Sequence, residues 1–169
     1  MYSDGYHLGK FNVTSGKLRV TDPCYDKGTW CSGNIDVPNG EWDAYLELSD
    51  EGSWGTRVAS IQIIKDNSPT SAAWELTNID VGVDSGQAGF FDESFYPDQP
   101  GLTSFYNKVC KLTTGREQGG IIDGFGAVSS TGYGDGGYKC YVARNDANEI
   151  VSAKIVFIDD EYEEEDDYE

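Results

Sequence analysis

Long apolar runs are missing from this sequence, which contains no stretch of about 18 apolar residues. A membrane-spanning helix is therefore excluded. The first residues, 1–6, also lack the basic and apolar regions of a secretory signal, so we expect a protein that stays in the cytoplasm in which it is made. Methionine occurs once against 21 glycines, which argues against a helical bundle and for many turns.

Histidine is almost absent, since His7 is the only one. A single histidine and four cysteines without a C-x-x-C pair cannot supply the usual ligand spacings of a structural zinc site. The cysteines lie at positions 24, 31, 110 and 140, and without an export signal we expect them to be reduced. Their expected role is that of small, buried apolar residues.

Basic residues are scarce as well, with 12 Lys and Arg against 30 Asp and Glu and a net charge of −18. Such a surface repels nucleic acid and anionic lipid, so we expect no direct binding to either. It suits a partner protein with a basic surface, including one that itself binds nucleic acid, although the charge could also serve solubility alone. Nine acidic residues fall in 159–169, which we expect to be a disordered tail beside a single domain over 1–158.

Alternation between apolar and polar residues is the strongest pattern in the chain. The clearest expected hairpin pairs 41–48, where Trp42, Ala44 and Leu46 share a face, with 56–65. Further strands are expected at 17–21, 74–83 (with a bulge or a break), 121–130 (broken by glycine), 138–144 and 149–158. Positions 26–40 are turn-rich, with a tight turn expected at 39–40.

One helix is expected at about 103–113. Phe105, Val109 and Leu112 recur there at near-helical spacing, and Thr103 or Ser104 can cap its start. Many short strands with a single helix indicate a mainly β fold, either a β-sandwich or a strongly curved antiparallel sheet.

The Val-Asp-Ser-Gly sequence at 83–86 invites comparison with a serine-protease nucleophile at Ser85. A catalytic triad also needs a histidine base, and His7 is the only candidate, so a turn with local hydrogen bonds to Asp84 is the better interpretation. Asp84 and Asp92 flank a stretch that could fold back and present both carboxylates to a divalent cation such as calcium, although no calcium-loop pattern occurs. A metal-dependent hydrolase using Asp22, Asp84 or Asp92 is a related alternative.

The segment 22–31 combines an acid, a pair of thiols and two aromatic residues. A reactive thiolate at Cys24 would need a nearby positive group, which the acidic surroundings oppose. The alternative is a structural turn packed by Tyr25 and Trp30.

A later stretch, 129–138, is rich in hydroxyls, aromatic rings and glycines. It could hold a small polar ligand or a partner's side chains, or it could be a flexible hairpin loop. Our candidate binding residues are Asp22, Cys24, Tyr25, Trp30, Asp84, Ser85, Gln87, Ser129, Ser130, Tyr133 and Asp135.

Six short segments together resemble a known group of proteins. They are Thr-Asp-Pro-Cys-Tyr at 21–25, Gly-Thr-Trp-Cys at 28–31, Asn-Gly-Glu-Trp at 39–42, Ser-Asp-Glu-Gly-Ser-Trp-Gly at 49–55, Gly-Val-Asp-Ser-Gly-Gln-Ala-Gly at 82–89 (continuing Phe-Phe-Asp to 92) and Gly-Tyr-Gly-Asp-Gly at 132–136. Over about 15–158 the chain resembles small uncharacterised proteins of tailed bacteriophages and bacteria and is similar to a bacterial domain-of-unknown-function family. The resemblance implies an intracellular accessory protein, and it carries no activity.

Three functions follow as hypotheses. The first is a non-enzymatic phage accessory protein that binds or inhibits a host protein of defence or nucleic-acid processing. The second is a protein that sequesters a small molecule such as a nucleotide. The third is the metal-dependent hydrolase, and a role in virion assembly is a further alternative. No cofactor is expected outside the divalent cation of the third hypothesis.

Overall fold

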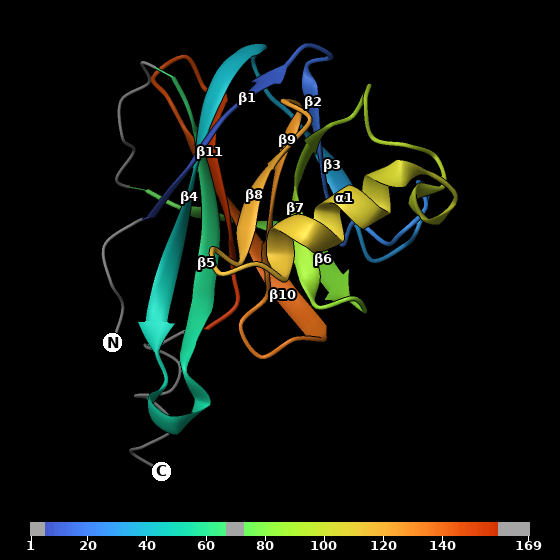
Figure 1. Ribbon diagram of the computed structural model, residues 1–169. Coiled ribbons are helices and arrows are strands. Elements are labelled where there is room, and N and C mark those ends of the chain that lie inside the picture. Colours follow the sequence, from blue (N-terminus) through green and yellow to red (C-terminus); the bar gives the residue numbers. More distant parts are fainter. Residues whose placement is uncertain (1–5, 67–72, 159–169) are drawn as a thin grey trace.

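Two antiparallel β-sheets and one helix make up the fold in the computed structural model, which describes residues 6–66 and 73–158 (Figure 1). The first sheet consists, in spatial order, of β1 (Tyr6–Val13), β4 (Gly40–Asp50), β5 (Thr56–Lys65), β11 (Ile150–Val156), β10 (Gly136–Arg144) and β6 (Glu75–Val83). The second sheet consists of β3 (Gly33–Asp36), β2 (Lys17–Thr21), β7 (Gln87–Asp92), β9 (Gly126–Ser130) and β8 (Gly119–Ile122). The remaining elements are α1 (Ser104–Thr113) and two short 3₁₀ turns, η1 (Gly52–Trp54) and η2 (Pro100–Leu102).

This architecture confirms the predicted mainly β fold of sandwich type with one short helix. The expected tail, 159–169, lies outside the described residues. Across 6–66 and 73–158, no helix has both the length and the apolar character needed to cross a membrane.

The main apolar core lies between the two sheets. On β4, Trp42, Ala44 and Leu46 are fully buried, as the alternation predicts, and Ile61 and Ile63 of β5 lie beside them. Removing each large apolar side chain from water contributes about 1.5–3 kcal/mol. The predicted pairing of these two strands is confirmed, and it forms the longest ladder of the first sheet.

A second, smaller core lies between the second sheet and α1, so β7 is buried on both faces. Phe90 of β7 points between the sheets, while Phe91 packs edge-on against Phe105 of α1. The helix starts where the Thr103 hydroxyl accepts a hydrogen bond from the Phe105 amide, which satisfies one of the free N–H groups of the first turn. The predicted helix is therefore confirmed.

Two local predictions were wrong. The expected Gly-broken strand at 121–130 is instead the hairpin β8–β9, whose connection, 123–125, has Asp123 and Gly124 at φ angles of 47° and 77°. Positive φ at both positions is the pattern of a type I′ turn, which Asp-Gly sequences favour. The expected tight turn at Asn39-Gly40 is also absent, because 33–36 forms β3 in the second sheet and β4 belongs to the first.

The two sheets end together where β6 and β3 lie, and this open side of the sandwich carries the site described below. The amide of Gly82 on β6 donates a hydrogen bond of 2.9 Å to the Cys31 carbonyl just before β3. The predicted irregularity of β6 is present: opposite Cys140, the Thr77 hydroxyl donates to the Cys140 carbonyl and accepts from the Ile79 amide. The Gly82–Cys31 bond holds the loop 22–32 against the end strand of the first sheet.

Candidate functional site

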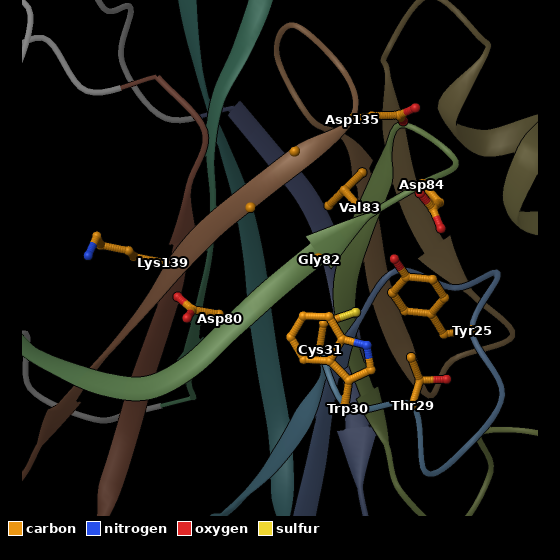
Figure 2. A pocket seen from close by; sticks show the side chains of 12 residues that line it. Tyr25, Thr29, Trp30, Cys31, Asp80, Gly82, Val83, Asp84, Asp135 and Lys139 are labelled. Carbon is orange, nitrogen blue, oxygen red and sulfur yellow. The ribbon is translucent and has the colours of Figure 1, made fainter.

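An open groove of about 960 Å³ lies where the loop 22–32 crosses the ends of β6 and β10 (Figure 2). Val81 and Val83 of β6 point into the core, so Asp80 and Gly82 between and beside them face outward. Across the ladder, Lys139 lies opposite Asp80 and Gly137 lies opposite Gly82. The groove is therefore formed on the outer face of the first sheet, at its end strand.

Glycines make the floor of the groove. Gly82 lies under the loop, where a Cβ atom would approach the Cys31 sulfur to 2.6 Å and the Tyr25 hydroxyl to 3.4 Å, so this position needs glycine to let the loop close. Gly137 on the neighbouring strand differs, because a Cβ atom there would meet nothing within 4 Å. Two adjacent strands thus expose bare backbone, and larger side chains surround it.

The walls of the groove combine aromatic rings with negative charge. Trp30 is 88% exposed, and Figure 2 shows it with Cys31 and Tyr25 on the loop side of β6. Asp84 and Asp135 are exposed at the rim, with Asp80 further along β6. Lys139 is the one basic residue in the lining. At neutral pH the groove is therefore a region of negative potential next to an exposed indole face.

Tyr25 adds a neutral hydroxyl to this lining. Burial, together with the neighbouring Cys31 thiol, raises the pKa of Tyr25 above its ordinary value. The phenol therefore keeps its proton near neutral pH and can act as a hydrogen-bond donor. The predicted turn packed by Tyr25 and Trp30 is only half right, because Trp30 projects into solvent instead of packing in the turn.

Asp22 is fully buried behind the groove and holds one of its rims. Its two carboxylate oxygens accept hydrogen bonds from the backbone amides of Cys24, Asp84 and Ser85, each at 2.8 Å, and from the Ser85 hydroxyl at 2.6 Å. Asp22, Cys24, Asp84 and Ser85 are all predicted binding residues, and these bonds bring the four together. The carboxylate of Asp22 faces the turn 83–86, so its role is to position Asp84 at the groove.

The Cys24 thiol lies in this buried network. Burial first, and then the nearby Asp22 carboxylate, raise the pKa of Cys24 to about 12. At neutral pH the sulfur is therefore a protonated thiol, which is a poor nucleophile. The expectation that acidic surroundings oppose a reactive thiolate agrees with this geometry. All four cysteines are free.

Gln87 and Ser85 are joined beneath α1, away from the groove. The Gln87 amide donates to the Ser85 hydroxyl at 3.0 Å and accepts from the Thr113 hydroxyl at 2.6 Å. Gln87 is buried, so its polar atoms link β7 to the end of the helix. Gln87, a predicted binding residue, is therefore buried next to the turn 83–86 and does not line the groove.

Asp92 lies at the opposite end of β7 from Asp84. The stretch between them does not fold back as expected, because 87–92 forms an extended strand between β2 and β9. Asp92 is buried and accepts hydrogen bonds from Thr14, Ser15 and Ser94. Asp22 and Asp92 also flank opposite ends of β2. In the described parts of the chain, no group of three or more His, Cys, Asp or Glu residues is arranged to hold a metal ion.

Asp92 gives the protein an expected acid sensitivity. Burial alone would raise the pKa of Asp92, but the hydrogen bonds from Ser15, Thr14 and Ser94 outweigh burial and hold the pKa below its ordinary value. A lowered pKa in the folded state gives stability that is present above the unfolded value of about 3.9 and is lost as the pH falls through the folded value.

Asp92→Asn should therefore lower the free energy of unfolding by about 1–3 kcal/mol at pH 7 and flatten its decline below about pH 4. Urea titrations at several pH values measure both effects. Asp146→Asn, at an exposed loop position, is the matched control and should follow the wild type. An Asp92→Asn curve parallel to that of the wild type throughout this pH range would contradict the assignment.

The stretch 129–138 contributes less to the groove than the sequence suggested. Ser129 is fully buried and donates to the Ser130 carbonyl, and Ser130 hydrogen-bonds Gln118. Tyr133 turns toward the β4–β5 hairpin, where its hydroxyl donates to Glu51 at 2.5 Å. Of the candidates in this stretch, Asp135 alone lines the groove.

Several groove residues escaped the sequence analysis. Asp80 and Lys139 lie in segments that we interpreted as strands, whereas Gly82 and Gly137 were expected at turns and loops and lie in β6 and β10. A signal was present, because an isolated glycine in a strand often marks close approach of a ligand or of another backbone. Gly82 and Gly137 form one groove floor only because their strands are adjacent, and the sequence pattern does not show which strands are neighbours.

Comparison of the chain with protein-family models, with curated proteins and with solved structures finds no match. The resemblance to small phage and bacterial proteins therefore stays a prediction.

Proposed function

We propose that this protein is a non-enzymatic binding domain that holds a positively charged segment of a partner protein in the groove. The observation that carries the proposal is the lining itself: a bare glycine floor, an exposed indole and three carboxylates beside a single ammonium group. A guanidinium or ammonium group can lie on the face of Trp30 and pair with a carboxylate at the rim. Such cation–π contacts contribute about 0.5–2 kcal/mol.

The surroundings of the other candidate residues also support binding over catalysis. The carboxylates of Asp22 and Asp92 are engaged by backbone amides and hydroxyls, and the Cys24 thiol is protonated at neutral pH. A nucleotide ligand is disfavoured, because its phosphates would meet the negative rim. If the family resemblance is right, the partner is a host protein of defence or nucleic-acid processing, whose basic surface the domain would cover.

Titration of isotope-labelled protein with a peptide of six arginines tests this proposal. Binding should shift the amide signals of Gly82, Gly136 and Gly137, and Trp30→Ala should weaken it by about tenfold, within the range of a cation–π contact. Affinity should fall steeply as the salt concentration rises from about 20 to about 500 mM. At the higher concentration, charges separated by more than a few ångströms are screened from each other.

A peptide of six glutamates is the negative control. Glu117→Gln, at an exposed position outside the groove lining, is the control for total charge and should leave the affinity nearly unchanged. The proposal fails if neither the arginine peptide nor capped arginine shifts the three glycine signals at low salt.

A further inference from the structure

A second hollow of about 390 Å³ continues the groove along the open side of the sandwich. It is lined by Ser32, Gly33 and Asn34 at the start of β3 and by Asn78 and Ile79 of β6. Trp30 and Asp80 belong to the linings of both hollows, so the two adjoin at these residues. The combined depression follows β6 from Asn78 to Asp84.

The length of this path fits a short extended chain. Six residue steps separate Asn78 from Asp84, which at about 3.3 Å per residue corresponds to about 20 Å along β6. An extended peptide of about six residues spans the same distance. A helix rises only about 1.5 Å per residue, so a short segment covers the whole path only when its backbone is extended.

The two hollows differ in chemistry. The groove presents the carboxylates of Asp84 and Asp135, Asp80 lies where the two hollows adjoin, and beyond it the second hollow presents the side-chain amides of Asn34 and Asn78 and the Ser32 hydroxyl. Amides and hydroxyls hydrogen-bond peptide groups and uncharged polar side chains. The path is therefore acidic at one end and neutral polar at the other.

The edge of β6 limits how such a chain can bind. Strand addition would need free backbone amides along that edge, but the Ile79 amide donates to the Thr77 hydroxyl and the Gly82 amide donates to the Cys31 carbonyl. These bonds and the bulge opposite Cys140 blunt the edge. Side chains, and not a backbone ladder, must hold the occupant.

We infer that the ligand is an extended partner segment of about six residues, with an arginine or lysine in the acidic groove, its backbone crossing Trp30, and small polar residues in the second hollow. This inference rests on the proposed function and specifies the partner's conformation and its sequence character. Charge complementarity fixes the basic end, and the amides of Asn34 and Asn78 fix the polar end.

The test compares two probes: capped arginine, and a capped hexapeptide with one terminal arginine followed by glycines and serines, made in both chain directions. For the wild type, the better hexapeptide should bind at least about tenfold more tightly than capped arginine, which corresponds to about 1.4 kcal/mol. The double variant Asn34→Ala, Asn78→Ala should abolish this advantage and leave the affinity for capped arginine unchanged. Both asparagines are exposed, so the variant should melt within about 1 °C to 3 °C of the wild type.

The outcomes separate the inference from the function on which it rests. If both probes bind equally, the extended ligand is wrong and the cation-binding groove stands. If the hexapeptide keeps its advantage in the double variant, the second hollow is not part of the site and the inference is overturned. If neither capped arginine nor the hexapeptide shifts the signals of Gly136 and Gly137, the proposed function itself fails.

Discussion

Replacing Asp22 with alanine should lower the free energy of unfolding by about 4 kcal/mol. The carboxylate is fully buried and accepts from three backbone amides and one hydroxyl. Alanine removes every one of these acceptors at once. Each buried donor left without a partner costs about 1–3 kcal/mol, and local rearrangement offsets part of that cost.

Denaturant titration measures the effect, and two variants calibrate it. Asp22→Asn keeps one acceptor oxygen and should lose only about 1–2 kcal/mol. Asp26→Ala, at an exposed position in the same loop, should stay within about 0.5 kcal/mol of the wild type. A loss below about 1 kcal/mol for Asp22→Ala would contradict the role of this carboxylate in holding the loop 22–32 against the turn 83–86.

The same substitution connects stability to binding. Asp22 holds the backbone at Asp84, and Asp84 forms part of the acidic rim. Where Asp22→Ala remains folded, its affinity for the arginine peptide should fall, because the rim loses its fixed geometry. Asp22 acts here as a positioning residue, so Asp22→Asn should restore most of the affinity together with most of the stability.

Replacing Gly137 with valine should abolish peptide binding without a loss of stability. A Cβ atom at this position meets nothing within 4 Å, and the backbone has no positive φ, so valine fits the strand and extends into the groove. Valine is favoured in strands on a scale that spans about 1 kcal/mol, and it reduces the freedom of the unfolded chain. Affinity for the arginine peptide should drop by at least about tenfold, while the free energy of unfolding stays equal or rises by up to about 1 kcal/mol.

Gly101→Ala provides the comparison for this experiment. Gly101 also has open space around its Cβ position, but it lies in η2 and outside the groove lining. It should leave peptide affinity unchanged. A Gly137→Val protein that is stably folded and binds the arginine peptide as the wild type does would show that the ligand lies elsewhere, whatever the effect of Trp30→Ala.

Local sequence patterns were sufficient for much of the fold. Alternation assigned the inward face of β4, because a strand with one buried face needs apolar residues at every second position. Helical spacing and a capping threonine located α1. The missed hairpin β8–β9 also had a local signal in its Asp-Gly turn.

Sequence also determined part of the site. Candidate residues were named in both 22–31 and 83–86, and the structure joins these two segments through Asp22. Their individual roles were not determined. The sequence suggests Asp22 as a binding residue, yet in the fold its buried carboxylate accepts hydrogen bonds from the backbone. The direction of this side chain depends on which loop packs above it.

The sequence by itself therefore determined an acidic, mainly β chain with one capped helix and a group of chemically rich turns, since composition and periodicity are local properties. The tertiary structure alone decided that β6 and β10 are neighbours, that Gly82 and Gly137 face each other, and that Trp30 stands exposed beside them. Strand order and register arise from contacts between residues far apart in the chain. Alternative pairings compete, and the total burial and hydrogen bonding decide among them. The groove is made of such contacts, so no single segment contains it.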